Sequence, residues 1–595
     1  MLGPLANQSR EQQNEGGTLR FSVLALDYDG TIARDGILDK HVKDALGEVR
    51  ARGIAVIIVT GRILSDLQRV AGDLQFADAV VAENGAVLAF PNGHSWLIGR
   101  PPEAVFVDEL RRRGIAFTTG QCLLETEAAL APQILAVIRE LEMPFVLVFN
   151  RSRVMVLPQG ISKATGLRRA LAALRLSPHN AIGVGDAEND HDLLAACEIG
   201  VAVGWGSPAL QRRADQVIRG AGPSDLAAYI RQASNITRLP PDWMGRDKII
   251  MGMTNGAPLG FTEQGSNVLV TGDPQSGKSW ATGVFCEQLM LHDYCTCVID
   301  PEGDYEQLEA LPRVAVLGRD DPLPSLPDLA RVLRHPDVSV VINLSRAPYE
   351  EKVKYLMTLL PMLASLRRQT GLPHRIVIDE AHYFLHEANV KELLDLGLGA
   401  YTLVTYRASD LNPDVRKAME IVCVTRSAAP EEAQAIAAMF GASPADLSSI
   451  LPTLKDGEAA VLLPSPEEGT KKIQRISLLP RLTGHVRHRA KYFEVPIPAG
   501  REFVFSADGR PVGPRCRTFK EFIAALGDVP GGVLDGHAHR GDFSRWIADV
   551  FHDHPLASDL RKLEQRYRLG YVESLSTELA KAIRERYEVE SELVL

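Results

Sequence analysis

The sequence predicts an α/β protein made of two successive doubly wound α/β units and a smaller α+β unit. Short apolar runs alternate with helical patterns over residues 20–230 and again over 247–480. Such alternation is typical of parallel sheets flanked by helices. Residues 493–595 begin with strand-like runs and then become helical. At roughly 100–200 residues per domain, a chain of this length has room for all three units.

The boundaries between these units follow from composition. Residues 1–19 are polar and lack an apolar signal core, so we expect a disordered lead-in. A polar stretch with a Pro-Pro pair at 231–246 predicts a linker. Within the first unit, residues 87–158 are expected to form an inserted α+β cap.

The first unit is expected to have strands at 21–26, 54–59, 77–83 and 180–185, with helices at 37–53, 63–74 and 162–174. In the second unit we expect strands at 267–272, 296–301, 338–344, 374–380, 400–406 and 420–425.

The overall composition is that of a globular protein, with 45% hydrophobic and 24% charged residues. A net charge of −10 argues against a protein that coats nucleic acid by charge alone, although it does not exclude a local basic channel. The seven cysteines contain no CxxC pair, which suits buried free thiols in a reducing cytoplasm. No apolar run is long enough to span a bilayer, so we expect a cytoplasmic protein without a membrane partner.

Two carboxylates, Asp27 and Asp29, end the first predicted strand. Alternation along a strand puts both on one side, at the sheet edge where open α/β folds bind ligands. Two carboxylates this close need a cation, and Mg²⁺ is the natural one. One acid could attack phosphorus while the other gives a proton to the leaving oxygen. Alone, however, this motif could also be a loop cap without chemistry.

Three further segments favour chemistry. Thr60 ends the next strand and offers a hydroxyl to a phosphate oxygen, while Lys163 opens a helix as a fixed cation. The strand at 180–185 runs into more carboxylates, including Asp186 and Asp190.

Together these motifs resemble the haloacid-dehalogenase-like (HAD) phosphatases, in the sugar-phosphatase-like branch, over residues 20–230. The resemblance implies that Asp27 becomes an aspartyl-phosphate and that Asp29 is the general acid and base, with its backbone carbonyl also binding Mg²⁺. Thr60 and Lys163 would hold the phosphoryl group.

By the same resemblance Asp186 would bind Mg²⁺, supported by Asp190 and Asn189. In this branch the cap selects the phosphorylated substrate. Arg111 to Arg113 and Arg151 could meet an anionic substrate, or could simply be solvated surface.

The second unit contains G-x-x-x-x-G-K-S between a strand and a helix: Gly272, Gly277, Lys278 and Ser279 are its fixed positions. In this context the glycines and the helix N-terminus surround phosphates. Lys278 would reach the β and γ phosphates of ATP and Ser279 would bind Mg²⁺.

A later apolar strand ends in Asp379 and Glu380. Asp379 would support Mg²⁺ and Glu380 would polarise the attacking water, which indicates ATP hydrolysis.

Residues 300–305, 403–411 and 456–463 give the second unit a resemblance to the HerA/FtsK group of ring-forming ATPases, nearest to HerA. Thr405 falls where that family keeps a polar sensor, although Tyr406 replaces the usual Gln. Arg426 matches a late arginine that could act as an arginine finger across a subunit boundary. Arg407 is the other candidate for the arginine finger, and for both residues the alternative is a surface ion pair. The resemblance implies a homo-hexamer that moves or remodels DNA.

The C-terminal unit resembles a small domain of unknown function found in bacterial proteins, and the resemblance carries no activity. His537, His539, His552 and His554 raise the hypothesis of zinc, but their spacing fits no familiar motif and no cysteine joins them. We expect a helical module that binds a partner protein.

The sequence therefore predicts a dual-activity enzyme: a phosphatase fused to an ATPase that works on nucleic acid, in bacterial DNA processing or antiviral defence. Two alternatives remain. One is a metabolic sugar-phosphate phosphatase with a regulatory ATPase, and the other is a non-catalytic phosphatase-like scaffold on an ATPase ring.

Overall fold

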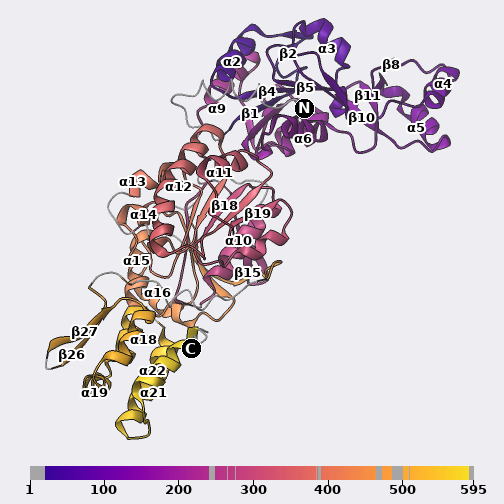
Figure 1. Cartoon of the computed structure of the whole chain (residues 1–595). Helices are drawn as coiled ribbons and strands as arrows, with labels where there is room; N and C mark the ends of the chain where they lie inside the picture. Colours follow the sequence, from indigo (N-terminus) through magenta and orange to yellow (C-terminus); the bar gives the residue numbers. More distant parts are fainter. Residues whose placement is uncertain are drawn as a thin grey trace. The chain divides into compact units, whose positions relative to one another are not determined.

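The computed structural model describes residues 21–236, 238–239, 248–263, 265–274, 276–319, 321–383, 385, 390–463, 472–484, 497, 500–507, 509–551 and 553–587. The lead-in expected at 1–19 and half of the linker expected at 231–246, namely residues 237 and 240–246, lie outside these residues. The chain divides into two compact units, described separately below (Figure 1). The first comprises Met1–Asp247, Pro327–Asp337 and Met362–His374, and the second comprises Lys248–Leu326, Val338–Pro361 and Arg375–Leu595.

The first unit is built on an eight-stranded sheet in the order β14-β13-β12-β1-β4-β5-β6-β7. Neighbouring strands from β14 to β5 pair in parallel, whereas β6 and β7 are antiparallel additions at one edge. The strands are β1 (Val23–Leu26), β4 (Ala55–Val59), β5 (Ala79–Ala82), β6 (Val87–Ala89), β7 (Ser95–Leu97), β12 (Ala181–Gly185), β13 (Ile199–Val203) and β14 (Gln216–Ile218). A short hairpin, β2 (Ala33–Arg34) and β3 (Ile37–Leu38), follows β1.

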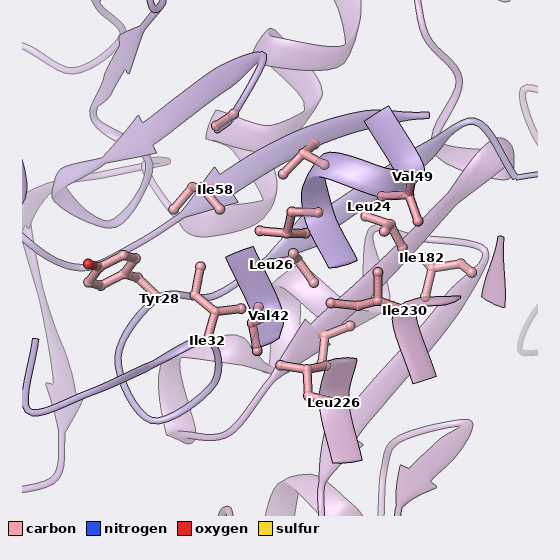
Figure 2. Packing of buried hydrophobic residues seen from close by; sticks show 14 of the residues in the cluster. Leu24, Leu26, Tyr28, Ile32, Val42, Val49, Ile58, Ile182, Leu226 and Ile230 are labelled. Atoms are coloured by element: carbon pink, nitrogen blue, oxygen red, sulfur yellow. The ribbon is translucent and has the colours of Figure 1, made fainter. Parts of the chain in front are cut away.

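Helices cover both faces of this sheet, because alternate residues of each buried strand point to opposite sides. Leu24, Leu26 and Ile182 pack against α2 (Lys40–Ala51), α3 (Leu64–Ala71) and α9 (Pro223–Ala233) on one face, and Figure 2 shows part of this cluster. Val23 and Ala25 pack on the other face, against α6 (Lys163–Leu174) and α7 (His191–Ala195). A short helix, α8 (Pro208–Gln211), follows β13. The predicted doubly wound architecture is confirmed here.

A smaller four-stranded antiparallel sheet forms the inserted cap, in the order β10-β11-β9-β8. Its strands are β8 (Thr118–Thr119), β9 (Leu124–Glu127), β10 (Phe145–Asn150) and β11 (Arg153–Pro158), and it packs on α4 (Ala104–Arg112) and α5 (Ala131–Glu140). The cap expected at 87–158 therefore starts later than predicted, since β6 and β7 belong to the larger sheet. The reason is local: a tight turn of left-handed residues at 83–85 folds β6 directly back onto β5.

The second unit contains an eleven-stranded sheet in the order β16-β15-β25-β24-β23-β17-β22-β21-β18-β20-β19. The seven strands from β23 to β19 run parallel, and the remaining four add antiparallel to one edge. They are β15 (Lys248–Thr254), β16 (Ala257–Thr262), β17 (Val268–Thr271), β18 (Thr296–Asp300), β19 (Val314–Gly318), β20 (Ser339–Asn343), β21 (Arg375–Ile378), β22 (Tyr401–Thr405), β23 (Ile421–Val424), β24 (Glu458–Leu463) and β25 (Lys472–Leu478). All six strands expected in this unit are present.

The helices between these strands are α10 (Lys278–Leu291), α11 (Leu326–Leu333), α12 (Tyr349–Thr370), α13 (Val390–Leu393), α14 (Pro413–Lys417), α15 (Pro430–Phe440) and α16 (Pro444–Ile450). The C-terminal part has a hairpin, β26 (Phe503–Ala507) and β27 (Arg510–Cys516), followed by α18 (Phe519–Asp528), α19 (Gly531–Arg540), α20 (Asp542–Trp546), α21 (His554–Arg568) and α22 (Leu575–Tyr587). Its core is rich in aromatic rings packed against one another, with Phe519 stacked on Phe551.

Two sequence expectations about the chain as a whole can be compared with the structure. All seven cysteines are buried thiols outside any disulfide, as predicted. Over the described residues, the helices are either too short or too polar to cross a membrane.

Candidate functional site

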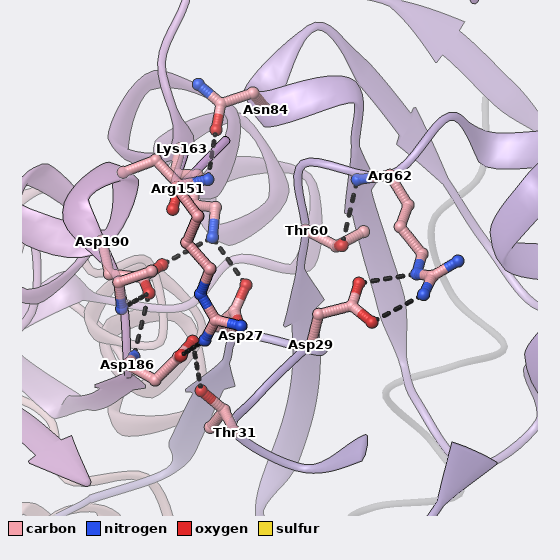
Figure 3. A network of polar contacts seen from close by, with 12 residues as sticks. Asp27, Asp29, Thr31, Thr60, Arg62, Asn84, Arg151, Lys163, Asp186 and Asp190 are labelled. Carbon is pink, nitrogen blue, oxygen red and sulfur yellow. Dashed lines mark hydrogen bonds and ion pairs between the residues drawn. The ribbon is translucent and has the colours of Figure 1, made fainter. Parts of the chain in front are cut away.

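Four predicted site residues meet at one edge of the first sheet. Asp27, Thr60 and Asp186 directly follow β1, β4 and β12, and these three strands are neighbours in the sheet. Lys163 is the first residue of α6, which begins there because Ser162 and Thr165 form a reciprocal capping box. The carboxyl ends of parallel strands thus gather the acids around one lysine, as Figure 3 shows.

Lys163 contacts two of the carboxylates in this group. Its Nζ lies 2.6 Å from Asp27 Oδ1 and 2.5 Å from Asp190 Oδ1, and all three side chains are buried. Although burial alone would lower the pKa of Lys163, the two carboxylates raise it above its usual value. The lysine therefore stays charged and balances part of the negative charge of the cluster.

The carboxylates form a cluster suited to a divalent cation. Ligand atoms of Asp27, Asp186 and Asp190 all lie within 4.8 Å of one another. Burial raises the pKa of Asp27 well above its usual range, since the pull of Lys163 only partly offsets it. Burial and the charge of Asp190 likewise raise the pKa of Asp186. Hard oxygen donors crowded in this way fit Mg²⁺, and these three residues would hold it.

The loop after β12 is itself shaped by Asp190. Its Oδ2 accepts hydrogen bonds from the backbone N–H groups of Asp186 and Ala187, both at 2.9 Å. Asn189 Nδ2 donates to Asn84 Oδ1 at 3.1 Å, so the loop is also tied to the end of β5. Asp190 thus both faces the lysine and fixes the direction of Asp186.

Asp29, the predicted general acid and base, lies beside this cluster rather than in it. Arg62 binds both of its carboxylate oxygens, with Nε 2.6 Å from Oδ2 and Nη2 2.7 Å from Oδ1. Arg62 also pairs with Asp66, which fixes the guanidinium from a second side. The role of Arg62 was not predicted, although it stands directly in the Thr60-Gly61-Arg62 motif. The predicted binding of Mg²⁺ by the Asp29 carbonyl remains a prediction.

Thr60, the predicted phosphoryl-binding hydroxyl, is buried at the end of β4. Its Oγ1 accepts the backbone N–H of Arg62 at 3.1 Å, which turns the chain sharply after the strand. This leaves the hydroxyl hydrogen to donate, as binding of a phosphate oxygen requires.

The cap contributes one arginine to the site. Arg151 Nη2 lies 2.5 Å from Asp186 Oδ2. The other cap arginines named from the sequence, Arg111 to Arg113, pair instead with Asp108, Glu109 and Glu140 on the helices of the cap. Of this set, only Arg151 is placed to meet a substrate.

A buried carboxylate that the sequence did not single out anchors the segment entering the cap sheet. Glu83 is fully buried, and its oxygens accept the backbone N–H groups of Gln121, Cys122 and Leu123 at 2.8 to 3.1 Å. Charged acceptors form strong hydrogen bonds with backbone amides. Glu83 therefore ties the cap sheet to the core next to the active site.

In the second unit the predicted phosphate loop follows β17. Lys278 Nζ donates to the backbone oxygens of Gly272 and Asp273, both at 3.0 Å, so the lysine folds back over the loop. Gly277 has the left-handed φ of +100° that favours glycine. Ser279 Oγ donates to Asp304 Oδ2 at 2.6 Å. Asp304 lies in the 300–305 segment but was not predicted to contact this serine.

The acidic pair Asp379 and Glu380 follows β21 and is buried. His382, not predicted as a site residue, connects it to the predicted sensor: its Nδ1 lies 3.4 Å from Glu380 Oε2 and 3.2 Å from Thr405 Oγ1. Burial lowers the pKa of His382 to about 4, so the imidazole is neutral near pH 7. Acid, histidine and threonine thus form one polar chain between β21 and β22.

The two arginine-finger candidates differ in environment. Arg407 is buried, with Nη1 3.2 Å from Asp410 Oδ2. The Arg426 side chain is partly exposed, 3.6 Å from Asp456 Oδ1. Exposure is what a residue acting on a neighbouring subunit needs, but the finger role of Arg426 remains a prediction.

Two of the four C-terminal histidines have well-defined partners. His537 Nε2 accepts the backbone N–H of Ser506 at 2.9 Å, and its Nδ1 lies 2.7 Å from Asp542 Oδ2. The exposed His539 bonds the Asp535 carbonyl. His552 and the His554 side chain lie outside the described residues. Because Nε2 accepts a backbone bond, His537 serves packing in this structure.

Comparison with known proteins addresses the first unit. Residues 24–97 and 116–222 match the family model described as haloacid dehalogenase-like hydrolase. A phosphoglycolate phosphatase of Methanopyrus kandleri is 29% identical over 36% of this chain and 96% of its own length. A phosphoglycolate phosphatase of Halorubrum lacusprofundi is 32% identical over 33% of this chain and 89% of its own length.

Among solved structures, a phosphatase of the HAD enzyme superfamily from Bacteroides thetaiotaomicron is 24% identical, with 36% of this chain and 96% of that chain covered and a TM-score of 0.31. The residues that match the family model contain Asp27, Thr60, Lys163 and Asp186, the four strand-end and helix-start residues that converge in the structure. Through this N-terminal phosphatase unit, the chain belongs to the haloacid dehalogenase-like hydrolases.

Proposed function

We propose that the first unit is a Mg²⁺-dependent phosphatase that hydrolyses a small phosphomonoester through an aspartyl-phosphate at Asp27. The observation that carries this proposal is the buried cluster of Asp27, Asp186 and Asp190 around Lys163. A buried group of acids around one fixed cation is costly to fold, and it is common where charge must be stabilised during a reaction.

In the proposed first step an Asp27 oxygen attacks phosphorus, and the bond between phosphorus and the ester oxygen breaks. Asp29 gives its proton to that leaving oxygen. In the second step Asp29 takes a proton from water, the water oxygen attacks phosphorus, and the acyl-phosphate bond breaks. Phosphate leaves and Asp27 is restored as a carboxylate.

The other residues hold the reacting groups. Lys163 and Thr60 bind phosphoryl oxygens, and Mg²⁺ would neutralise phosphoryl charge when held by the three carboxylates. Asp29 has to exchange its contact with Arg62 for the leaving oxygen, because Arg62 occupies both of its oxygens in the present structure.

The cap favours a small substrate, since caps close over the reacting groups and exclude water. Relatives named phosphoglycolate phosphatase, matched over almost their full length, support the same choice. A sugar phosphate is the second small-molecule candidate. Phosphate-ended DNA is the substrate that direct coupling to a DNA motor would require.

A panel of these three substrate types tests the proposal, with phosphate release measured in Mg²⁺ and after chelation. We expect turnover of a small ester that stops on chelation and in Asp27→Asn. No release from any ester would favour the non-catalytic scaffold, and release from DNA ends alone would favour the nucleic-acid enzyme.

A second candidate function is supported by the phosphate loop of the other unit. We propose that this unit hydrolyses ATP with Mg²⁺, with Lys278 and Gly277 at the phosphates, Ser279 and Asp379 at the ion, and Glu380 at the attacking water. One strand, β22, separates β17 from β21 in the sheet, so the loop and the acidic pair open onto the same edge. A Lys278→Ala protein that hydrolyses ATP at the wild-type rate would overturn this assignment.

We further propose, from the HerA resemblance, that the ATPase forms a homo-hexamer that moves or remodels DNA, in bacterial DNA processing or antiviral defence. The C-terminal unit would bind a partner protein. Mass measurement in solution with and without ATP tests the ring, and ATP turnover with and without DNA tests the nucleic-acid partner. A monomer under both conditions would contradict the ring and favour a regulatory ATPase domain.

A further inference from the structure

The cap places a single arginine in the mouth of the phosphatase site. Arg151 occupies the two-residue turn between β10 and β11, with Asn150 and Arg153 paired on either side. Its φ is +54°, in the left-handed region. The guanidinium reaches Asp186 Oδ2 at 2.5 Å, and Figure 3 shows it entering beside Asp27 and Asp186.

The guanidinium of Arg151 lies close to the loop of Asp27, Asp29 and Gly30. A β-carbon built on Gly30 would lie 2.9 Å from Arg151 Nη2. Gly30 directly follows Asp29, the residue proposed to protonate the leaving oxygen. Arg151 thus stands beside the loop that carries Asp27 and Asp29 and next to Asp186, on the cap side of the site, whereas Lys163 faces Asp27 and Asp190 within the core.

The face of the cap sheet next to Arg151 also covers the site. Met155, in the neighbouring strand β11, has its Sδ 3.3 Å from a β-carbon built on Gly61, in the Thr60-Gly61-Arg62 loop. Val148 pairs with Met155 across the two strands, so both side chains share that face. A leaving group in this space would meet an apolar cap surface with one cation at its edge.

The guanidinium of Arg151 is accessible to an anionic substrate. Its side chain is 68% exposed, and in this structure its partner is Asp186, one of the three acids suited to Mg²⁺. Once Asp186 shares its charge with Mg²⁺, the attraction between Asp186 and the guanidinium weakens. A planar guanidinium binds a carboxylate through two parallel hydrogen bonds, which gives geometric selectivity.

We propose that Arg151 is a specificity residue that binds a carboxylate on the leaving group, so that the preferred substrates are small phosphorylated carboxylic acids. This inference rests on the proposed phosphatase function of the same site. It adds to that function a residue of the cap and a chemical property of the substrate.

The experiment compares two esters of similar size on the full-length protein in Mg²⁺: phosphoglycolate, and 2-hydroxyethyl phosphate, in which a neutral hydroxymethyl group replaces the carboxylate. We expect wild type to prefer phosphoglycolate by about tenfold or more in kcat/KM, the scale of one charged hydrogen-bond pair. Arg151→Gln should remove the preference through a higher KM for phosphoglycolate, with little change for the neutral ester. Arg151→Lys should keep part of the preference.

Arg153→Gln is the matched control, because Arg153 begins β11 directly after the turn but pairs with Glu125 within the cap. It should keep the wild-type preference. The inference is overturned if wild type shows no preference, if Arg151→Gln keeps it, or if that variant weakens both esters equally, since Arg151 would then contact the phosphoryl group or act on folding. Absence of phosphate release from either ester by wild type would instead overturn the phosphatase function itself.

Discussion

The ammonium group of Lys163 lies 2.6 Å from the carboxylate of Asp27, and both side chains are almost fully buried. A second carboxylate, Asp190, lies 2.5 Å from the same nitrogen. One lysine therefore faces two acids, and Arg151 pairs with the third, Asp186, so three carboxylates share two cations. Because the negative charge is not fully balanced, we expect this cluster to bind a divalent cation and to destabilise the first unit when no cation is bound.

Removal of the lysine charge should destabilise the first unit. Lys163→Met leaves buried acids without their counter-charge, which costs about 3–5 kcal/mol of the free energy of unfolding. Mg²⁺ should restore part of the loss, because it supplies positive charge to the same oxygens. Thermal unfolding with and without Mg²⁺ measures both effects. The exposed Lys43→Met in α2 is the control, and an unchanged transition in Lys163→Met would contradict the role of Lys163 as counter-charge.

Loss of the nucleophile should abolish phosphatase turnover without unfolding the protein. Asp27→Asn keeps the shape of the side chain but removes the attacking carboxylate, so kcat should fall by at least about 10³-fold. Phosphate release from a small ester in Mg²⁺ is the readout. Asp35→Asn, an exposed residue of the turn between β2 and β3, should leave the rate unchanged. A rate in Asp27→Asn within tenfold of wild type would exclude the covalent mechanism.

The sequence predicted the convergence of the catalytic residues because it depends on topology. Asp27, Thr60 and Asp186 end buried strands, and parallel strands bring their carboxyl ends to one edge whatever the details of packing. The partners of these residues could not be predicted in the same way. Whether Arg151 reaches Asp186 depends on the geometry of a turn and on side-chain rotamers, which no pattern in the chain encodes.

Short elements limited the prediction of domain boundaries for a similar reason. β6 and β7 have three residues each, too few for their alternation to show whether they pair with the core sheet or the cap. In the structure, the left-handed turn at Glu83, Asn84 and Gly85 folds β6 back onto β5, so that β6 and β7 join the core sheet. In the second unit, the contact between Ser279 and Asp304 crosses 25 positions of sequence and links two motifs that the sequence shows only separately.

Glu83 should control the attachment of the cap. Glu83→Ala leaves the backbone N–H groups of Gln121, Cys122 and Leu123 without their acceptor, and each unsatisfied buried group costs about 1–3 kcal/mol. Amide hydrogen exchange at 121–123 should therefore accelerate before exchange in the core sheet changes. Glu127→Ala, exposed on β9, is the control. Equal exchange in wild type and Glu83→Ala would show that other contacts hold this segment.

His382 should make the stability of the second unit depend on pH. Burial lowers its pKa from 6.5 to about 4, against the opposing charge of Glu380. Between these values the unfolded chain binds more protons than the folded one, so stability rises with pH. The contribution is fully present above pH 6.5, is lost as pH falls through 4, and amounts to at most about 3 kcal/mol.

Calorimetry of the full chain at several pH values between about 4.5 and 7 tests this dependence. This range covers most of the interval between the folded and unfolded pKa values of His382, where stability should change with pH. His382→Gln cannot take up the proton, so its second-unit transition should shift less with pH than that of wild type. His539→Gln is the matched control because His539 is exposed and bonds a backbone carbonyl. The same pH slope in wild type and His382→Gln would mean that the imidazole does not have to lose its proton for the second unit to fold. The neutral link between Glu380 and Thr405 would then have to be abandoned.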